Sequence, residues 1–185
     1  ADFVRIMVPN RKIPVMFSTG NDSFSTKDLI VISGNAEKNL DATVGISLHE
    51  SLHILRSDFE VLSKLGTYIP DPLIKQYSIN FSVDEHVAKY EIFNRIKKIH
   101  NVIEDRWVDD WGYRIAPGYR GYFDEMYKDC FLHPLVDKAL QSDIYRDETW
   151  DSYDFRFVNI INKNTDLKAL KGLKEIWECL DVHNI

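Results

Sequence analysis

The chain has 185 residues, 44% of them hydrophobic, and a formal net charge of −6. This is enough apolar material for one domain with its own core, and too little chain for two full-sized domains. An acidic protein of this kind is not expected to present an extended nucleic-acid surface, which requires a clustered excess of Lys and Arg. Because no stretch approaches the ~20 consecutive apolar residues that cross a bilayer, we also expect no membrane span.

The cysteines and the one basic cluster do not point to a site. Cys130 and Cys179 lack the close spacing of a metal-binding or redox pair, so we expect two buried free thiols and a reducing, cytoplasmic compartment. Arg95, Lys97 and Lys98 lie close together in the sequence, and this pattern is typical of the solvated face of a helix.

The N-terminal third is predicted to contain strands. Residues 12–18 form a short apolar run that is followed by the turn signal Gly20, Asn21 and Asp22. Residues 29–33, with the sequence LIVIS, are rich in β-branched side chains and predict a second strand. We expect this second strand to be the exposed edge of the sheet.

Two long helices are predicted next. Residues 40–59 carry one apolar stripe with steps of three and four: Val44, Leu48, Leu52, Leu55 and Phe59. After a break at residues 67–72, a longer helix is expected to begin at the N-cap Ser82, with Glu85 completing a capping box, and to end near Gly112. Its expected stripe is Ile92, Ile96, Ile99, Ile103 and Trp107.

The rest of the chain is predicted to be helical and peripheral, with helices over residues 119–131, 134–142, 150–161 and 167–180. Strands followed by helices indicate an α+β fold rather than a repeating βαβ sheet. We therefore expect a single domain over residues 1–185, with a catalytic core over 1–122 and a helical extension over 123–185.

His49, Glu50 and His53 match the pattern H-E-x-x-H inside the first long helix. Side chains four positions apart lie one helical turn above each other, so two imidazoles can reach one ion. Zinc binds imidazole nitrogen at roughly 2.0–2.1 Å and lowers the pKa of a bound water toward about 7. Glu50 is expected to take the proton from that water as a general base. The alternative is a pair of histidines that only pack and form hydrogen bonds.

A third protein ligand must come from elsewhere in the chain. Glu104 lies on the second long helix, one step round from the expected apolar stripe, where a carboxylate needs a partner. Zinc would be such a partner. The alternative is a purely structural role for Glu104, as a salt bridge to Arg106 or Lys97. We therefore predict zinc ligation by His49, His53 and Glu104.

Three other residues remain open as ligands. His100 lies one turn before Glu104 and His86 lies further up the same helix, and either could replace Glu104. Asp58 follows His53 by five positions, so it is expected instead to cap the next segment or to form a hydrogen bond with a ligand histidine.

The segments HESLHILRSDF (residues 49–59) and NVIEDRWVDDWGYRIAPGY (residues 101–119) together resemble metallopeptidase-like proteins associated with von Willebrand-A-like domains. That group includes phage-encoded members and relatives of a cobalt-chelatase subunit, and it combines H-E-x-x-H with N-x-x-E-D-x-R and a later Pro-Gly. The resemblance covers residues 29–122 and departs from the group's pattern at residues 106–109. It implies a zincin-like metallopeptidase fold, Glu104 as the third ligand, and a further domain or partner chain.

The expected function is zinc-dependent hydrolysis of a peptide or protein substrate. The substrate is expected to pair with the edge strand at residues 29–33 by β-augmentation. Tyr113 or Tyr119 could stabilise the oxyanion.

Two other classes of function also fit the sequence. One is a catalytically silent, zinc-stabilised structural or interaction module, for example of a phage. The other is a metal-free protein-binding domain whose contacts with a partner come from aromatic residues in the helical segments: Trp107, Trp111, Tyr122 and Tyr127.

Overall fold

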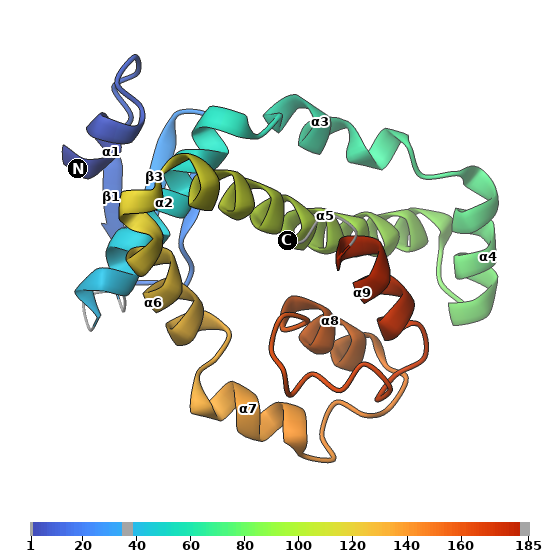
Figure 1. The fold of residues 1–185 in the computed structure, drawn as a ribbon. Helices are drawn as coiled ribbons and strands as arrows, with labels where there is room; N and C mark the ends of the chain where they lie inside the picture. Colours follow the sequence, from blue (N-terminus) through green and yellow to red (C-terminus); the bar gives the residue numbers. More distant parts are fainter. Residues whose placement is uncertain (1, 35–38, 182–185) are drawn as a thin grey trace.

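A computed structural model describes residues 2–34 and 39–181. As expected, it is an α+β fold with a small sheet near the N-terminus and helices after it (Figure 1). The elements before the second long helix are α1 (Asp2–Met7), β1 (Val15–Ser18), β2 (Phe24–Thr26), β3 (Leu29–Ser33), α2 (Leu40–Arg56), α3 (Phe59–Lys64), η2 (Leu65–Thr67) and α4 (Asp71–Phe81). The others are α5 (Glu85–Ile115), η3 (Pro117–Tyr119), α6 (Arg120–Cys130), α7 (Pro134–Gln141), α8 (Trp150–Val158) and α9 (Leu173–Asp181).

The sheet has the strand order β1-β3-β2, with β1 parallel and β2 antiparallel to β3. The expectation that residues 29–33 form the edge is therefore wrong, because β3 is the central strand. Its side chains Ile30 and Ile32 are fully buried, as a continuous apolar run in a covered strand should be. Within the described residues β2, which the sequence analysis did not predict, pairs on one side only and is an edge of the sheet.

Helix α2 begins where it was predicted, because the Asn39 side chain caps it by accepting a hydrogen bond from the Ala42 amide. It ends at Arg56 rather than at residue 59, since Ser57 has an extended backbone (φ −73°, ψ 140°). Asp58 then caps α3 by accepting hydrogen bonds from two backbone amides, which confirms its expected role as a cap.

Helix α5 begins after the N-cap Asp84, so the predicted capping box at Ser82 is wrong. Ser82 instead ends α4 in the left-handed conformation, with φ 53°.

The apolar stripe predicted for α5 is also wrong beyond Ile96: Ile99, Ile103 and Trp107 are each at least 40% exposed. The residues buried in the second half of α5 are Val102, Arg106, Val108, Asp109 and Gly112.

The four helices predicted in the last third are present, but α6 is not peripheral. It packs closely along α2: a Cβ added to Gly45 of α2 would lie 2.2 Å from the Tyr122 carbonyl oxygen. The division expected between residues 122 and 123 therefore falls inside a helix that covers the H-E-x-x-H segment. Cys130 and Cys179 are free as expected, but both are exposed rather than buried.

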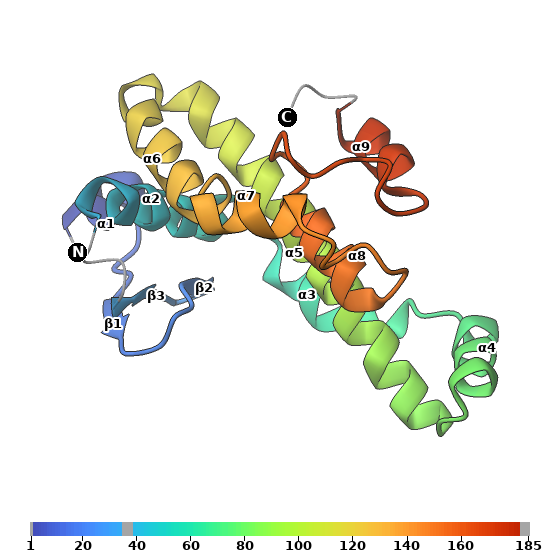
Figure 2. The ribbon, with the colours of Figure 1, turned by 90° about the horizontal axis from the view of Figure 1, so that it is seen from below.

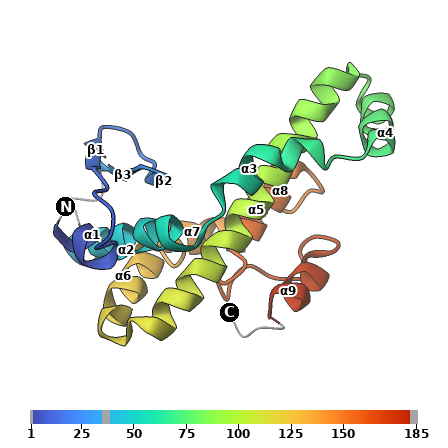
Figure 3. The ribbon, with the colours of Figure 1, turned by 90° about the horizontal axis from the view of Figure 1, so that it is seen from above.

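Helix α2 lies between two core clusters. One joins it to α1 and the sheet through Val4, Val8, Ile13, Ile30, Ile32 and Ile54, and the other joins it to α5 and α6 through Leu48, Leu52, Val108, Phe123 and Met126. By contrast, α4 and the first turns of α5 lie at the end of the molecule farthest from the sheet (Figures 2 and 3). Within residues 2–34 and 39–181, none of the helices has the length and hydropathy that a membrane span requires.

Candidate metal centre

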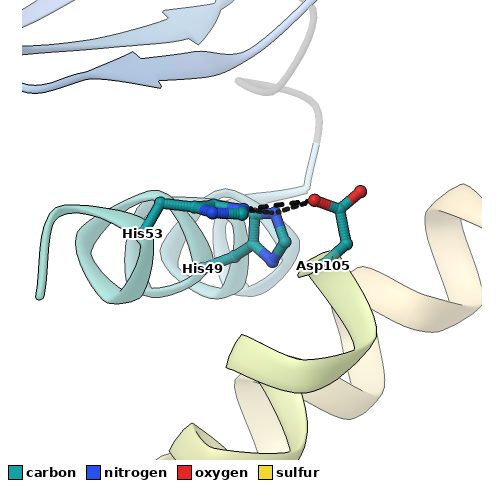
Figure 4. Close-up of side chains that lie close together, drawn as sticks. All are labelled: His49, His53 and Asp105. Carbon is teal, nitrogen blue, oxygen red and sulfur yellow. Dashed lines mark hydrogen bonds and ion pairs between the residues drawn. The ribbon is translucent and has the colours of Figure 1, made fainter. Parts of the chain in front are cut away.

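The two histidines of the H-E-x-x-H segment converge at one point. Their Nε2 atoms lie 3.1 Å apart, and their rings meet edge to face with centroids 4.7 Å apart. Both side chains are largely buried, with 15% of His49 and 10% of His53 exposed. Figure 4 shows both imidazoles projecting from α2 toward a carboxylate of α5.

That carboxylate belongs to Asp105. Its Oδ1 lies 3.2 Å from His53 Nε2 and 3.8 Å from His49 Nε2. Two ligand atoms bound to one tetrahedral zinc at roughly 2.0–2.2 Å lie about 3.3–3.6 Å apart. The triangle of His49, His53 and Asp105 is close to this size, and the three residues form a group that could hold a metal ion.

Glu104, the carboxylate predicted as third ligand, lies beside this group but is not one of its converging atoms. Its Oε2 is 3.7 Å from His100 Nδ1, and the side chain forms part of a cavity wall next to the histidine pair. Glu104 thus pairs with His100, and not with Arg106 or Lys97, the partners expected for a purely structural role. Ligation by Glu104 stays a prediction, and Asp105 is the better-placed carboxylate.

The other nitrogen of each imidazole is held by a neighbouring side chain. His49 Nδ1 lies 2.6 Å from the buried Asp109 carboxylate, and His53 Nδ1 lies 2.7 Å from Ser57 Oγ. Such partners fix the ring orientation and leave Nε2 free to ligate. Although burial lowers the pKa of His49, the carboxylates around it, Asp109 first and then Glu50 and Asp105, together outweigh burial and raise the pKa above the usual value.

Glu50 is buried on the same stretch of α2, with 5% of the residue exposed. Its carboxylate accepts a hydrogen bond from the Ser25 side chain of β2. Burial raises the pKa of Glu50 above its usual range, against the lowering effect of the two histidines and Ser25. A raised pKa moves a carboxyl group toward the range in which it is an effective general base at neutral pH.

Two cavities adjoin the candidate centre. One, of about 160 Å³, is lined by residues of β2, α2, α3 and α5, and the other, of about 340 Å³, is lined by the loop before β2 together with α2, α5 and α6. Ser23, His49, Glu50 and Asp105 line both cavities. The candidate centre therefore lies within one cleft, with the edge strand β2 along its wall.

The other residues considered from the sequence lie elsewhere. The Tyr113 hydroxyl is 3.5 Å from an Asp124 carboxylate oxygen, and the Tyr119 ring packs against Phe3, so neither tyrosine lines the two cavities. His86 is exposed in the first turn of α5. Trp107 and Trp111 both stack with the Arg56 guanidinium, which covers part of the aromatic surface suggested for a partner.

Sequence reasoning missed Asp105 and Asp109 as parts of the site. Together with Val102 and Arg106 they occupy positions i, i+3, i+4 and i+7, which is one face of a helix. Their charge made this face resemble the solvated side. The available signal was their spacing: two carboxylates four residues apart can face two histidines four residues apart.

Comparison of the chain with protein-family models, curated proteins and solved structures found no match.

Proposed function

We propose that this protein is a zinc-dependent peptide hydrolase with a zincin-like site. The observation that supports the proposal best is the convergence of His49 Nε2, His53 Nε2 and an Asp105 carboxylate oxygen, with Glu50 buried in the same cleft. Two imidazoles and one carboxylate are a common ligand set of catalytic zinc, because they leave a coordination position open.

His49, His53 and Asp105 would hold the ion, and Asp109 and Ser57 would orient the two imidazoles. An ion bound there would polarise a carbonyl group and make water more acidic. Other divalent ions accept the same nitrogen and oxygen ligands, and zinc is proposed because a compact set of three protein ligands suits its tetrahedral geometry.

Glu50 would act as the general base. From its place in the cleft its carboxylate can accept a proton from the attacking water and then deliver it to the leaving amine. The hydrogen bond from Ser25 would orient the carboxylate toward the cleft. A metal site with a purely structural role would not require a buried carboxylate at this position.

The substrate would be an extended peptide. Among residues 2–34 and 39–181, no strand pairs with the outer edge of β2, which offers backbone hydrogen-bonding groups next to Glu50. Ser23, Phe24 and Ser25 line the adjoining cavity. A peptide can add to such an edge as another strand. This moves the expected β-augmentation from residues 29–33 to residues 24–26.

The experiment compares the wild-type protein with Glu50→Gln on a fluorophore-labelled, disordered protein substrate. We expect the variant to bind zinc as the wild type does and to lose hydrolysis by at least about 100-fold, since the general base is gone. Glu60→Gln, which changes an exposed carboxylate on α3, is the matched control. Retained turnover in Glu50→Gln would refute this role.

A catalytically silent, zinc-stabilised module remains the second proposed function. It predicts that zinc raises the melting temperature of the protein while no substrate is cleaved, whether or not a chelator is present. Hydrolysis that a chelator abolishes and zinc restores would exclude it.

A further inference from the structure

A chain of hydrogen bonds leads from the candidate centre into the C-terminal helices. His49 Nδ1 lies 2.6 Å from Asp109 Oδ1. The other oxygen of Asp109 accepts a hydrogen bond from the Tyr127 hydroxyl at 2.7 Å. Tyr127 in turn accepts one from the Arg106 guanidinium at 3.0 Å.

The chain is largely shielded from water. Asp109 is 5% exposed and Arg106 is 6% exposed. Burial, together with the nearby Asp109 carboxylate, raises the pKa of Tyr127, so the phenol stays protonated and donates a hydrogen bond to Asp109. A hydrogen bond to a buried charged group is stronger than one at the surface, and leaving a buried carboxylate without a donor is costly.

Arg106 anchors this chain to the last third of the protein. Its guanidinium donates to the Val158 carbonyl at the end of α8, at 3.2 Å, and lies over the Phe131 ring at 4.4 Å. Tyr127 is on α6, which packs closely along α2, and its hydroxyl reaches across to Asp109 on α5. The segment that the sequence suggested as a separate extension thus supplies a support for His49.

We propose that Tyr127 is a positioning residue of the metal centre: its hydroxyl fixes the Asp109 carboxylate, which holds the His49 ring with Nε2 facing the ion. This deepens the proposed function by adding a supporting residue to the same site. The role of Tyr127 rests on the proposed function only in that the site must bind an ion. It does not require that the protein hydrolyses a substrate.

The test uses Tyr127→Phe, which removes only the hydroxyl and keeps the ring that packs against Phe131. Zinc affinity is measured by competition with a chromophoric chelator. Loss of a direct partner of a ligand histidine lowers metal affinity by about 10–100-fold. We expect Asp109→Asn to fall in that range and Tyr127→Phe, one bond further out, to weaken binding by about tenfold.

Tyr113→Phe is the matched control, because it removes a tyrosine hydroxyl on α5 that does not contact Asp109. It should leave zinc affinity unchanged. A second measurement, the NMR resonance of the His49 Nδ1 proton in zinc-free protein, reports the Asp109 contact directly. We expect that resonance to shift in Tyr127→Phe and not in Tyr113→Phe, whereas loss of stability alone would not move it.

The outcomes separate this inference from the proposed function. If the wild type binds zinc and Tyr127→Phe matches it in affinity and in the His49 resonance, the positioning role is wrong while the metal site stands. If the wild type binds no zinc, the proposed function is wrong. In that case the His49 resonance still decides whether Tyr127 orients the ring through Asp109.

Discussion

The two halves of α5 bury different kinds of side chain. In the first half, Ala88 and Ile92 pack with Ile69 and Ile74 in a small apolar cluster under α4. In the second half, the face that turns toward α2 and α6 carries Asp105, Arg106 and Asp109 among valines. One continuous helix therefore serves as a packing surface at one end and as the wall of a polar site at the other.

This difference indicates where function is located in the molecule. Apolar residues at helical spacing stabilise the fold wherever they occur and are not specific to any activity. Charged residues at the same buried spacing must each find a partner, because an unpaired buried charge is destabilising. For Asp109 on α5, those partners are His49, a proposed metal ligand, and Tyr127, both on other helices. Substitutions in the two halves of α5 should therefore have different effects.

Removal of Asp105 should have the largest effect on metal binding. Asp105→Ala deletes a proposed ligand, so zinc affinity should fall by more than the roughly 10–100-fold that loss of an outer partner causes. Asp110→Ala, on the same helix and paired with Arg114, is the control and should bind zinc normally. Isothermal titration of zinc-free protein measures both, and normal binding by Asp105→Ala would exclude it as a ligand.

Substitution in the first half of α5 should change stability instead. Ile92→Ala removes a buried side chain from the cluster under α4 and should lower the free energy of unfolding by about 2–5 kcal/mol. Chemical denaturation of zinc-free protein measures this loss. Zinc affinity should remain within about twofold of wild type. A large fall in affinity would show that the two halves are not independent.

Zinc affinity should fall as the pH is lowered. Because the pKa of His49 in the zinc-free protein is raised, its imidazole is a cation at neutral pH, with a second proton that the ion must displace. Lower pH favours that proton, so we expect about a tenfold loss of affinity per unit between about pH 8 and pH 6. Titrations across this range measure it, with circular dichroism to verify the fold. Affinity that does not vary with pH would contradict a protonated His49.

The smallest effect is expected for Glu104. The ion pair between its carboxylate and His100 is long and partly exposed. Exposed ion pairs contribute about 0–1 kcal/mol to the free energy of unfolding. Glu104→Gln should therefore change zinc affinity by less than about fivefold in the same titration. A loss as large as that of Asp105→Ala would identify Glu104 as the third ligand, as the sequence predicted.

Sequence reasoning could predict the local part of the site. The spacing of His49 and His53 depends on residues within one turn of α2, and the structure has that helix beginning where it was expected. The phase of α5 could not be predicted in the same way. Ile99 and Ile103 have the right spacing for a core stripe but face outward, because contacts with distant helices decide which face is covered.

The edge strand was missed for a related reason. β2 has three residues, and a run this short has no periodicity to detect. Its position depends on pairing with β3, whose apolar run was recognised but assigned to the edge. Tyr127 was considered only as a contact with a partner, since nothing in the sequence near it indicates Asp109, which lies on another helix.

Anomalous diffraction at the zinc edge from crystals of zinc-loaded protein tests the central claim most directly. We predict one peak at about 2.0–2.2 Å from His49 Nε2, His53 Nε2 and an Asp105 carboxylate oxygen. A peak away from the two imidazoles, or no peak at saturating zinc, would contradict the metal centre. A peak with both imidazoles but with Glu104 in place of Asp105 would contradict only the third ligand proposed from the structure.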